Sequence, residues 1–242
     1  MSLQRITTLP GLFITATDTE VGKTIIAGAI ADWFRRRARR VGVLKPVASG
    51  CVKRREGLVS EDAEFLAHCA DARFPLDLIC PNRYFEPLAP SVAADRAGVA
   101  VDFGAVQRSI DLMSASSDVM IVEGAGGVMT PLSATVSVLD VMEQLKLPVV
   151  IVARPGLGTV NHTVLTVDAV RARGLKVVGV VINRYPPDRA GVVEETNPAL
   201  VEKWAKVPVL TLVPDVDAGI TDRLPADVVA AIDRVDWDFL SR

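Results

Sequence analysis

The stretch ATDTEVGKT (residues 16–24) decides the fold, because it ends in Gly22, Lys23 and Thr24, the close of a phosphate-binding loop. Such a loop usually reads G-x-x-x-x-G-K-[ST], in which the lysine contacts the β and γ phosphates and the hydroxyl ligates Mg²⁺. Thr17 stands where the first glycine of that pattern would be. The apolar run GLFITAT nonetheless leads into the stretch, and the helical pattern KTIIAGAIADWF follows it. Free backbone N–H groups at such a helix start attract an anion, so the context predicts a phosphate site.

Short apolar runs rich in Val, Ile and Leu alternate with helical patterns along the chain. The runs lie at residues 11–17, 41–45, 118–124, 147–153, 177–183 and 207–213. Helices are expected at residues 23–39, 61–70, 104–115, 137–145, 159–173 and 197–205. Near-continuous apolar strands are typical of a parallel sheet buried on both faces. The sequence therefore predicts an α/β fold with a doubly wound, mostly parallel sheet, helices on both faces, and a single domain over residues 1–242.

The composition indicates a globular protein, since 50% of the 242 residues are hydrophobic and 23% are charged. A formal net charge of -2 gives no footprint for nucleic acid, and no apolar run approaches the roughly 18 residues that span a membrane. Three scattered cysteines predict no disulfide framework, and the first residues lack the features of a signal peptide, so a cytoplasmic protein is expected. Two histidines argue against zinc and favour a hard, oxygen-bound metal ion.

Two acidic residues are candidates for that metal ion. Glu123 ends a buried run ahead of the glycine-rich turn GAGG, where ligands bind to parallel sheets. It would complement Mg²⁺ held by Thr24, and the alternative is a solvated loop residue. Asp62 begins the helical pattern SEDAEFLA, and by its own context it is a first-turn charge that favours the helix dipole.

Two basic features have different interpretations. Lys45 ends the second apolar run before Pro46, which favours an extended backbone, so its ammonium is expected at the same sheet edge as Lys23 and Glu123. Two lysines near one nucleotide would neutralise the charge of a transferring phosphoryl group. The run RRRARR (residues 35–40) is interpreted as cations at the end of the first helix, with a nucleic-acid patch as the alternative.

Two classes of nucleotide-binding protein lack their signatures here. The run VVGVVIN ends in Asn183 but continues RYPP, so the N-K-x-D guanine signature is absent and ATP is expected rather than GTP. The chromosome-partitioning and division-site ATPases share the order of these motifs, but their loop carries a further lysine in the pattern K-G-G-x-G-K-[ST]. No lysine precedes Lys23 in the loop of this chain.

A set of motifs resembles the dethiobiotin synthetase family. The motifs are TDTEVGKT, KPVASG, VEGAGG, TPLS (130–133), LPV (147–149), LGTVNHT (157–163) and the strand-ending Asn183. Their order and spacing match that family from about residue 11 to about residue 215. The family's phosphate loop has five residues between its glycines, and Ala16 stands at the first of those glycine positions.

The resemblance implies an ATP-dependent ring closure. One amine of 7,8-diaminononanoate takes up CO₂ as a carbamate, ATP phosphorylates the carbamate to a mixed anhydride, and the second amine closes the cyclic urea with release of ADP and phosphate. The alternatives are a switch ATPase of the partitioning type and the synthetase half of a cobyrinate-type amidotransferase. The sequence ends at Arg242 without room for a glutaminase domain, which counts against the second alternative.

The resemblance also implies roles for individual residues. The expected Mg²⁺ ligands are Thr24, Asp62 and Glu123, and the expected catalytic residues are Lys45, Lys23 and Thr19. The expected contacts to ATP are Glu20, Val21, Gly22, Lys23, Thr24, Asp62, Glu123, Gly124, Ala125, Gly126, Asn183, Pro214 and Asp215. Substrate-binding roles fall to Ser49, Gly158, Thr159 and Asn161.

The segment PGLGTVNHT (155–163) carries the expectation of a homodimer with shared active sites. In the resembled family this segment reaches the substrate carboxylate of the neighbouring subunit. Free N–H groups at its helix start suit an anion. The alternative is an ordinary strand-to-helix turn with Thr159 as the N-cap.

Overall fold

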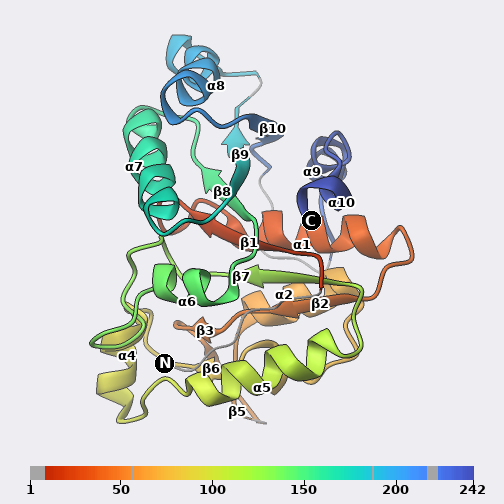
Figure 1. Ribbon diagram of the computed structural model, residues 1–242, viewed down its shortest axis with the longest axis vertical. Helices are drawn as coiled ribbons and strands as arrows, with labels where there is room; N and C mark the ends of the chain where they lie inside the picture. Colours follow the sequence, from red (N-terminus) through yellow and green to blue (C-terminus); the bar gives the residue numbers. More distant parts are fainter. Residues whose placement is uncertain (1–8, 56, 187, 217–222) are drawn as a thin grey trace.

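The centre of the fold is a parallel sheet whose six strands lie in the order β10-β9-β8-β1-β7-β2 (Figure 1). The computed structural model describes residues 9–55, 57–186, 188–216 and 223–242. The strands are β1 (Gly11–Ala16), β2 (Val41–Leu44), β7 (Val119–Glu123), β8 (Val149–Ala153), β9 (Val177–Tyr185) and β10 (Val209–Pro214). All six fall on the predicted apolar runs, so the predicted α/β fold with a parallel sheet is confirmed.

Two small sheets lie near one edge of the central sheet. β3 (Val47–Ala48) pairs in parallel with β6 (Asn82–Arg83), and β4 (Val52–Arg54) pairs antiparallel with β5 (Gly57–Val59). None of these four strands was predicted, because strands of two or three residues carry no measurable hydrophobic period. Along the chain, β3, β4 and β5 lie between β2 and α2, whereas β6 lies between α3 and α4.

The helices surround the sheet (Figure 1). They are α1 (Lys23–Arg35), α2 (Glu61–Ala70), α3 (Leu76–Ile79), α4 (Pro90–Ala97), α5 (Phe103–Ser114), α6 (Val138–Leu145), α7 (Thr159–Ala172), α8 (Val192–Ala205), α9 (Ala226–Ile232) and α10 (Trp237–Leu240). Among the residues that the structure describes, no helix is both long enough and apolar enough to cross a membrane.

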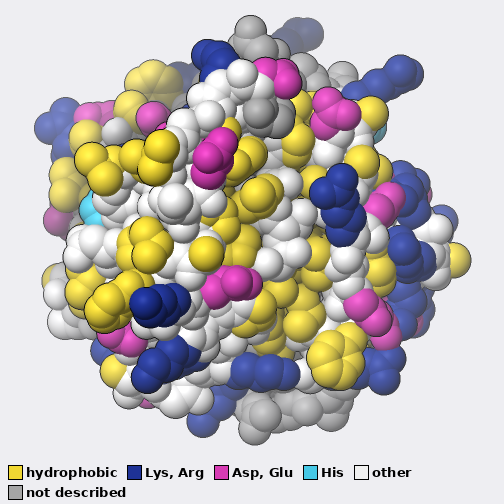
Figure 2. Space-filling model, turned by 90° about the horizontal axis from the view of Figure 1, so that it is seen from above, with side chains coloured by type: hydrophobic (Ala, Val, Ile, Leu, Met, Phe, Trp, Pro, Cys, Tyr) yellow, Lys and Arg dark blue, Asp and Glu magenta, His cyan; other side chains and the backbone are white. Residues whose placement is uncertain are grey.

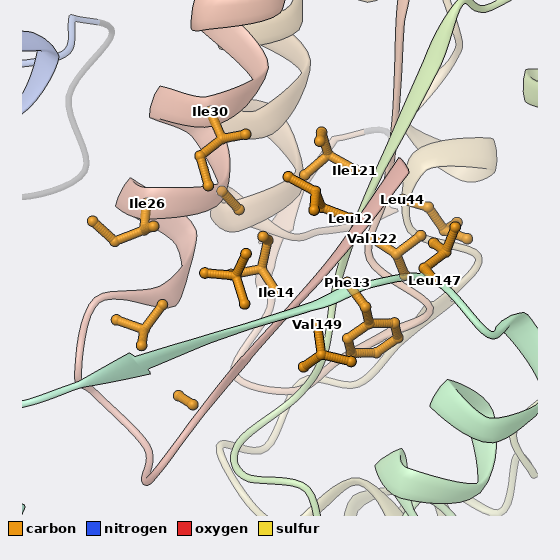
Figure 3. Close-up of a cluster of buried hydrophobic side chains, with 14 of the residues drawn as sticks. Leu12, Phe13, Ile14, Ile26, Ile30, Leu44, Ile121, Val122, Leu147 and Val149 are labelled. Carbon is orange, nitrogen blue, oxygen red and sulfur yellow. The ribbon is translucent and has the colours of Figure 1, made fainter. Parts of the chain in front are cut away.

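The central strand β1 shows why helices lie on both faces. Leu12 and Ile14 point toward Ile26 and Ile30 of α1, whereas Phe13 points to the opposite face (Figure 3). On that side a Cβ added to Gly124 would lie 3.1 Å from the Phe13 ring and 3.0 Å from Val138, the first residue of α6. Because successive side chains of a strand point to opposite faces, consecutive residues of β1 pack into the core on both sides of the sheet.

A glycine in α1 brings α2 close to the centre of the molecule. A Cβ on Gly28 would lie 2.4 Å from the ring of Phe65, so a larger residue would push α2 away. The first turn of α2 is capped by Ser60, whose hydroxyl accepts a hydrogen bond from the Ala63 amide at 3.3 Å. Close packing and this cap together position Asp62, the second residue of the helix.

The boundaries of the predicted helices differ from prediction by more than one residue in two places. α1 ends at Arg35 instead of residue 39, and Ala38 has a φ of 57°, which a helix cannot accommodate. α8 begins at Val192, five residues before the predicted start, and contains Pro198 within it. Its first turn is supported by Glu194, whose carboxylate accepts a hydrogen bond from the Gly191 amide at 3.0 Å.

The C-terminal stretch is packed into the fold. The Trp237 side chain of α10 is fully buried, and its Nε1 donates a hydrogen bond to the carbonyl of Ile232 at 2.9 Å. The segment 72–103, whose structure the sequence did not indicate, contains α3, β6 and α4.

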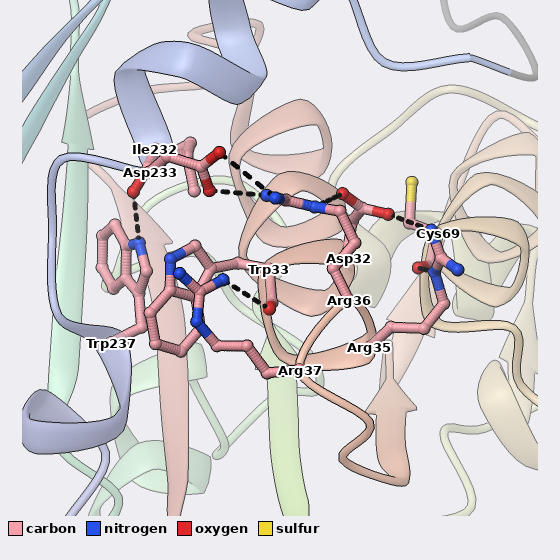
Figure 4. Close-up of polar contacts among 9 residues, drawn as sticks. All are labelled: Asp32, Trp33, Arg35, Arg36, Arg37, Cys69, Ile232, Asp233 and Trp237. Carbon is pink, nitrogen blue, oxygen red and sulfur yellow. Dashed lines mark hydrogen bonds and ion pairs between the residues drawn. The ribbon is translucent and has the colours of Figure 1, made fainter.

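The arginine run makes specific contacts at the end of α1 (Figure 4). Arg36 donates to Asp32 at 2.7 Å and to Asp233 of the α9 C-cap at 2.6 Å, and the Arg37 guanidinium lies 3.6 Å above the Trp33 ring. On the face shown in Figure 2, Lys and Arg side chains lie mainly toward the rim, with Asp and Glu side chains among them. The run therefore serves the end of the helix, as predicted, and joins α1 to α9.

Candidate active site

The phosphate loop starts without a glycine because its first position is still part of a strand. Ala16 is the last residue of β1, pairs with Val152 of β8, and is not among the residues with positive φ. The left-handed positions of the loop are Glu20 (φ 58°) and Gly22 (φ 86°). Alanine at position 16 thus costs no backbone strain.

The loop is attached to β9 through Asn183. The Asn183 side chain, on a residue that is 4% exposed, donates a hydrogen bond from Nδ2 to the Val21 carbonyl at 2.8 Å. A Cβ on Gly22 would lie 2.1 Å from that nitrogen, so only glycine leaves room for this bond. The residue expected to contact adenine therefore holds the loop from behind, and it does not line the cavity described below.

Four side chains converge at the other side of the loop. Thr24 donates a hydrogen bond to Glu123 Oε1 at 2.9 Å, and the Lys45 ammonium lies 2.8 Å from the same oxygen. Lys45 also forms an ion pair with Asp62. The structure thus brings Lys45 and Glu123 together, as the sequence predicted for one sheet edge, and adds Thr24 from α1 and Asp62 from α2, which the family resemblance assigned to the same Mg²⁺.

Burial governs the charges of this cluster. Glu123 is 1% exposed, which rules out the solvated loop residue considered as an alternative. Burial lowers the pKa of the Lys45 ammonium, but the charges of Glu123 and Asp62 more than offset this and raise it above its ordinary value. Burial lowers the pKa of Lys23, with Glu123 acting in the opposite direction. Lys45 is therefore a buried ammonium stabilised by ion pairs with Glu123 and Asp62.

The donor set fits a magnesium ion. Glu123 Oε2 is buried without a hydrogen-bond partner among the described residues, so one carboxylate oxygen is free for a cation. Within that part of the chain, no group of three or more His, Cys, Asp and Glu side chains could hold a metal by itself. A hydroxyl and two carboxylates would leave the other positions to phosphate oxygens and water, as Mg²⁺ prefers.

A cavity of about 790 Å³ lies beside the loop and this cluster. The predicted residues that line it are Thr19, Glu20, Gly22, Lys23, Thr24, Lys45, Ser49, Asp62, Glu123, Ala125 and Gly126. The rest of its lining is Ile25, Val47, Ala48, Pro87, Leu88, Ala89, Pro90, Thr130, Pro131 and Arg184. The cavity thus joins a charged end to an apolar wall, of which residues 87–90 were not predicted. The signal for that wall was the stretch NRYFEPLAPSVAADRAG (82–98), which loosely resembles the substrate-side segment of the dethiobiotin synthetase family.

Some predicted residues lie elsewhere. Val21, Gly124 and Asn183 are buried and do not line the cavity, and neither do Pro214 and Asp215 at the end of β10. Asp215 instead lies 3.8 Å from Arg189 in an ion pair. The structure therefore does not place these residues at the cavity surface.

The start of α7 is also outside the cavity of this chain. Gly158, Thr159 and Asn161 do not line it. The N-cap is Gly158, with a φ of 92°, and the fully buried Thr159 follows it, so the N-cap interpretation of Thr159 is wrong. Arg154 was missed by the sequence analysis, yet its guanidinium would lie 3.6 Å from a Cβ at position 158.

A parallel sheet, a phosphate loop between β1 and α1, and a Thr–carboxylate pair at 2.9 Å define a P-loop nucleotide-binding protein. Among solved structures, the fold is similar to the MinD cell division protein of Aquifex aeolicus, at a TM-score of 0.56 and 14% identity over 93% of this chain and 94% of that one. A ParA family ATPase of Chlorobium tepidum reaches 0.57 at 15% identity, over 96% and 98% of the two chains. At such identities the likeness shows the fold alone.

The family is shown by closer relatives. Residues 10–220 match the AAA domain family. The ATP-dependent dethiobiotin synthetase of Thermodesulfovibrio yellowstonii is 36% identical over 84% of this chain and 88% of its own length, and that of Bacillus thuringiensis is 41% identical over 89% and 87%. The Bacillus cereus enzyme is 42% identical over 88% and 86%. This chain belongs to the ATP-dependent dethiobiotin synthetase family.

Proposed function

We propose that this chain joins CO₂ to 7,8-diaminononanoate and closes the cyclic urea of dethiobiotin, with conversion of ATP to ADP and phosphate. It is a ligase that forms C–N bonds. The observation that carries the proposal is the Lys45 ammonium, 2.8 Å from Glu123 at the charged end of a cavity that also holds the phosphate loop. Family membership supports the same reaction.

The cations of the cavity match the charge that develops in the reaction. A carbamate oxygen attacks the γ phosphorus of ATP, and such a transfer needs positioning and positive charge more than covalent help. Lys23, the first residue of α1, would contact the β and γ phosphates. Lys45 binds the carbamate as it forms and holds its oxygen in line with the phosphorus. Mg²⁺, held by Thr24, Asp62 and Glu123, would neutralise the charge of the terminal phosphates.

The remaining lining suits the organic substrate. Thr19 and Ser49 offer hydroxyl groups for the amines and the carbamate. The apolar wall of residues 87–90 and Pro131 would contact the methylene chain of the diamine, since apolar surface is removed from water there. The cavity therefore offers charge at the reacting end and apolar surface along the chain of the substrate.

The function can be tested by measuring ADP release with Mg²⁺, ATP and bicarbonate, with and without diaminononanoate. We expect release to depend on the diamine and to equal the dethiobiotin formed. A switch ATPase would hydrolyse ATP at a rate indifferent to the diamine. An amidotransferase half would need an ammonia source in place of bicarbonate. Either of these results would refute the proposed function.

We also propose a homodimer in which each active site is shared. The start of α7 is absent from the cavity of its own chain, while Leu157 beside it is 83% exposed. Asn161 and Leu165 lie one turn apart on α7, and both are exposed. An exposed polar group flanked by exposed leucines suits a contact with a second copy. The free backbone N–H groups at the start of α7 would bind the carboxylate of the substrate that lies in the cavity of that second copy.

The shared site predicts complementation between two inactive variants, Lys45→Ala and Gly158→Asp. The aspartate places a negative charge where the substrate carboxylate binds, and Gly158→Asn is its neutral control. When the two variants exchange subunits, half of the dimers are mixed. Each mixed dimer carries both defects in one site and none in the other, so activity should return to about a quarter of wild type. No recovery on mixing would show that each site is built from one chain.

A further inference from the structure

Asn82 of β6 is a buried polar residue outside the cavity lining, with 6% of its surface exposed. Its side-chain Nδ2 donates a hydrogen bond to the carbonyl of Pro46 at 2.9 Å, and Pro46 directly follows Lys45. The residue roles implied by the family resemblance do not include Asn82. We propose that Asn82 is a positioning residue: it fixes the backbone beside Lys45 and thereby holds the ammonium in place for the reaction. This inference rests on the function proposed above and adds a residue that acts through Lys45.

Both polar groups of the Asn82 side chain are used. Oδ1 accepts a hydrogen bond from the backbone amide of Asp102 at 2.7 Å, while Nδ2 donates to the Pro46 carbonyl and, at 3.4 Å, to the Asp102 carbonyl. Turning the amide over would place two donors or two acceptors against each other, so the side chain has one orientation. Asp102 is the N-cap of α5. The side chain therefore connects the backbone that follows Lys45 to the start of a helix.

The segment around Asn82 also holds the backbone on both sides of Pro46. The amide of Lys45 donates to the carbonyl of Ile79 at 2.7 Å, and Val47 of β3 lies opposite Asn82 in the parallel pair with β6. Proline has no backbone N–H, so the carbonyl is the only backbone hydrogen-bonding group of Pro46, and Asn82 binds it. Lys45 is thus held directly before and directly after its own peptide unit.

The Lys45 ammonium depends on this backbone for its contacts. Its Nζ lies 2.8 Å from Glu123 Oε1, and a shift of about 1 Å would take it beyond hydrogen-bond distance. A misplacement of that size can cost about a hundredfold in rate. β6 also leads to residues 87–90, the apolar wall that would contact the diamine. One buried amide therefore sets the position of the lysine relative to that wall.

The test compares two substitutions in the same segment. Asn82→Leu keeps a side chain of similar size and removes both hydrogen bonds. Tyr84→Phe is the matched control, because Tyr84 is 3% exposed, lies outside the cavity lining, and donates its own buried hydrogen bond to the Val99 carbonyl at 3.0 Å. We expect Asn82→Leu to lower kcat for dethiobiotin formation by about thirtyfold to a hundredfold, and to change the Kd for Mg²⁺ and ATP by less than about fivefold. Tyr84→Phe should keep kcat within about twofold of wild type.

A second comparison separates positioning from a general structural role. The same substitution is made in the Lys45→Ala protein, where the group that Asn82 positions is already gone. Asn82→Leu should then lower the residual kcat by less than about threefold, because the two residues act as one unit. Asn82→Ala, which removes the hydrogen bonds without an apolar side chain of equal size, should give the same pattern and serves if Asn82→Leu does not fold. All rates are measured at a temperature where the denaturation curve shows each variant to be folded.

Three results would overturn the inference. Near-normal kcat in the Asn82 variants would remove the positioning role. Equal losses from Asn82→Leu with and without Lys45 would make the residue a structural one, and so would an equal loss in Tyr84→Phe. A wild type that forms no dethiobiotin would instead refute the proposed function, so the two failures are distinguishable.

Discussion

Replacing Lys45 by methionine tests the buried cation between Glu123 and Asp62. Methionine keeps an unbranched stem and removes the charge. Lys45 Nζ lies 2.8 Å from Glu123 Oε1, and at an effective dielectric constant of ~20 this separation corresponds to about 6 kcal/mol of attraction. The removal of Glu123 from water offsets part of that, and loss of one partner from a buried pair costs about 3–5 kcal/mol. Asp62, with 32% of its side chain exposed, adds little.

We therefore expect Lys45→Met to lower the free energy of unfolding by about 3 kcal/mol in the presence of EDTA. The assay is urea denaturation, with Lys176→Met as the control for an exposed lysine, which should stay within about 0.5 kcal/mol of wild type. Addition of Mg²⁺ should stabilise Lys45→Met more than wild type, because the ion can then neutralise Glu123. The double variant Lys45→Met with Glu123→Gln should be less destabilised than the sum of the single variants.

The pH dependence of this difference follows from the raised pKa of Lys45. A group whose pKa is raised on folding contributes stability that is fully present below its unfolded pKa and is lost only as the pH rises through the folded pKa. Wild type should therefore keep this contribution from about pH 6 to about pH 9. In Lys45→Met the buried Glu123 loses the charge that lowers its pKa, so the difference between the two proteins should narrow toward the acidic end of that range, where Glu123 takes up a proton. A Lys45→Met protein as stable as Lys176→Met would refute the buried ion pair.

The other predictions concern metal, loop and pH. Glu123→Gln should weaken the Mg²⁺ dependence of turnover, because an amide is a poorer partner for a hard cation, and an unchanged Mg²⁺ titration would contradict that role. Gly22→Ala should abolish measurable ATP binding, since the new Cβ would meet Asn183 Nδ2 at 2.1 Å and a φ of 86° is strained; a calorimetric titration decides this. Turnover should rise toward mildly alkaline pH, because the attacking amine must be neutral, and a flat pH profile of kcat would argue against a free amine as nucleophile.

The sequence predicted the strands that carry the site, because buried parallel strands appear in a sequence as continuous apolar runs. The runs 41–45 and 118–124 correspond to β2 and β7, and the residues at their ends, Lys45 and Glu123, meet at 2.8 Å. Parallel strands end at one edge of a sheet, so correct strand ends were sufficient to bring these charges together. Asp62 could be placed there only through the family resemblance, because its position depends on how closely α2 packs against α1.

What the sequence could not predict depends on contacts between distant segments or on backbone torsions. The positive φ of Arg184 could not be predicted, because arginine rarely adopts the left-handed conformation. The apolar wall of residues 87–90 follows β6, which pairs with β3, and strands of two residues have no pattern to recognise. The helix expected at residues 197–205 begins instead at Val192.

The phosphate loop lacks a glycine at position 16, although the family pattern has one there, because the backbone at this position does not require it. A glycine is needed where φ is positive or where a neighbour leaves no room for a Cβ. Position 16 meets neither condition, because Ala16 still pairs within the sheet. Gly22 meets both, and the neighbour that excludes a Cβ there is Asn183, 161 residues further along the chain at the end of another strand. The steric need for a glycine at position 22 therefore comes from Asn183 on β9. A smaller residue at position 183 would remove that steric need, but the positive φ at position 22 would still favour glycine.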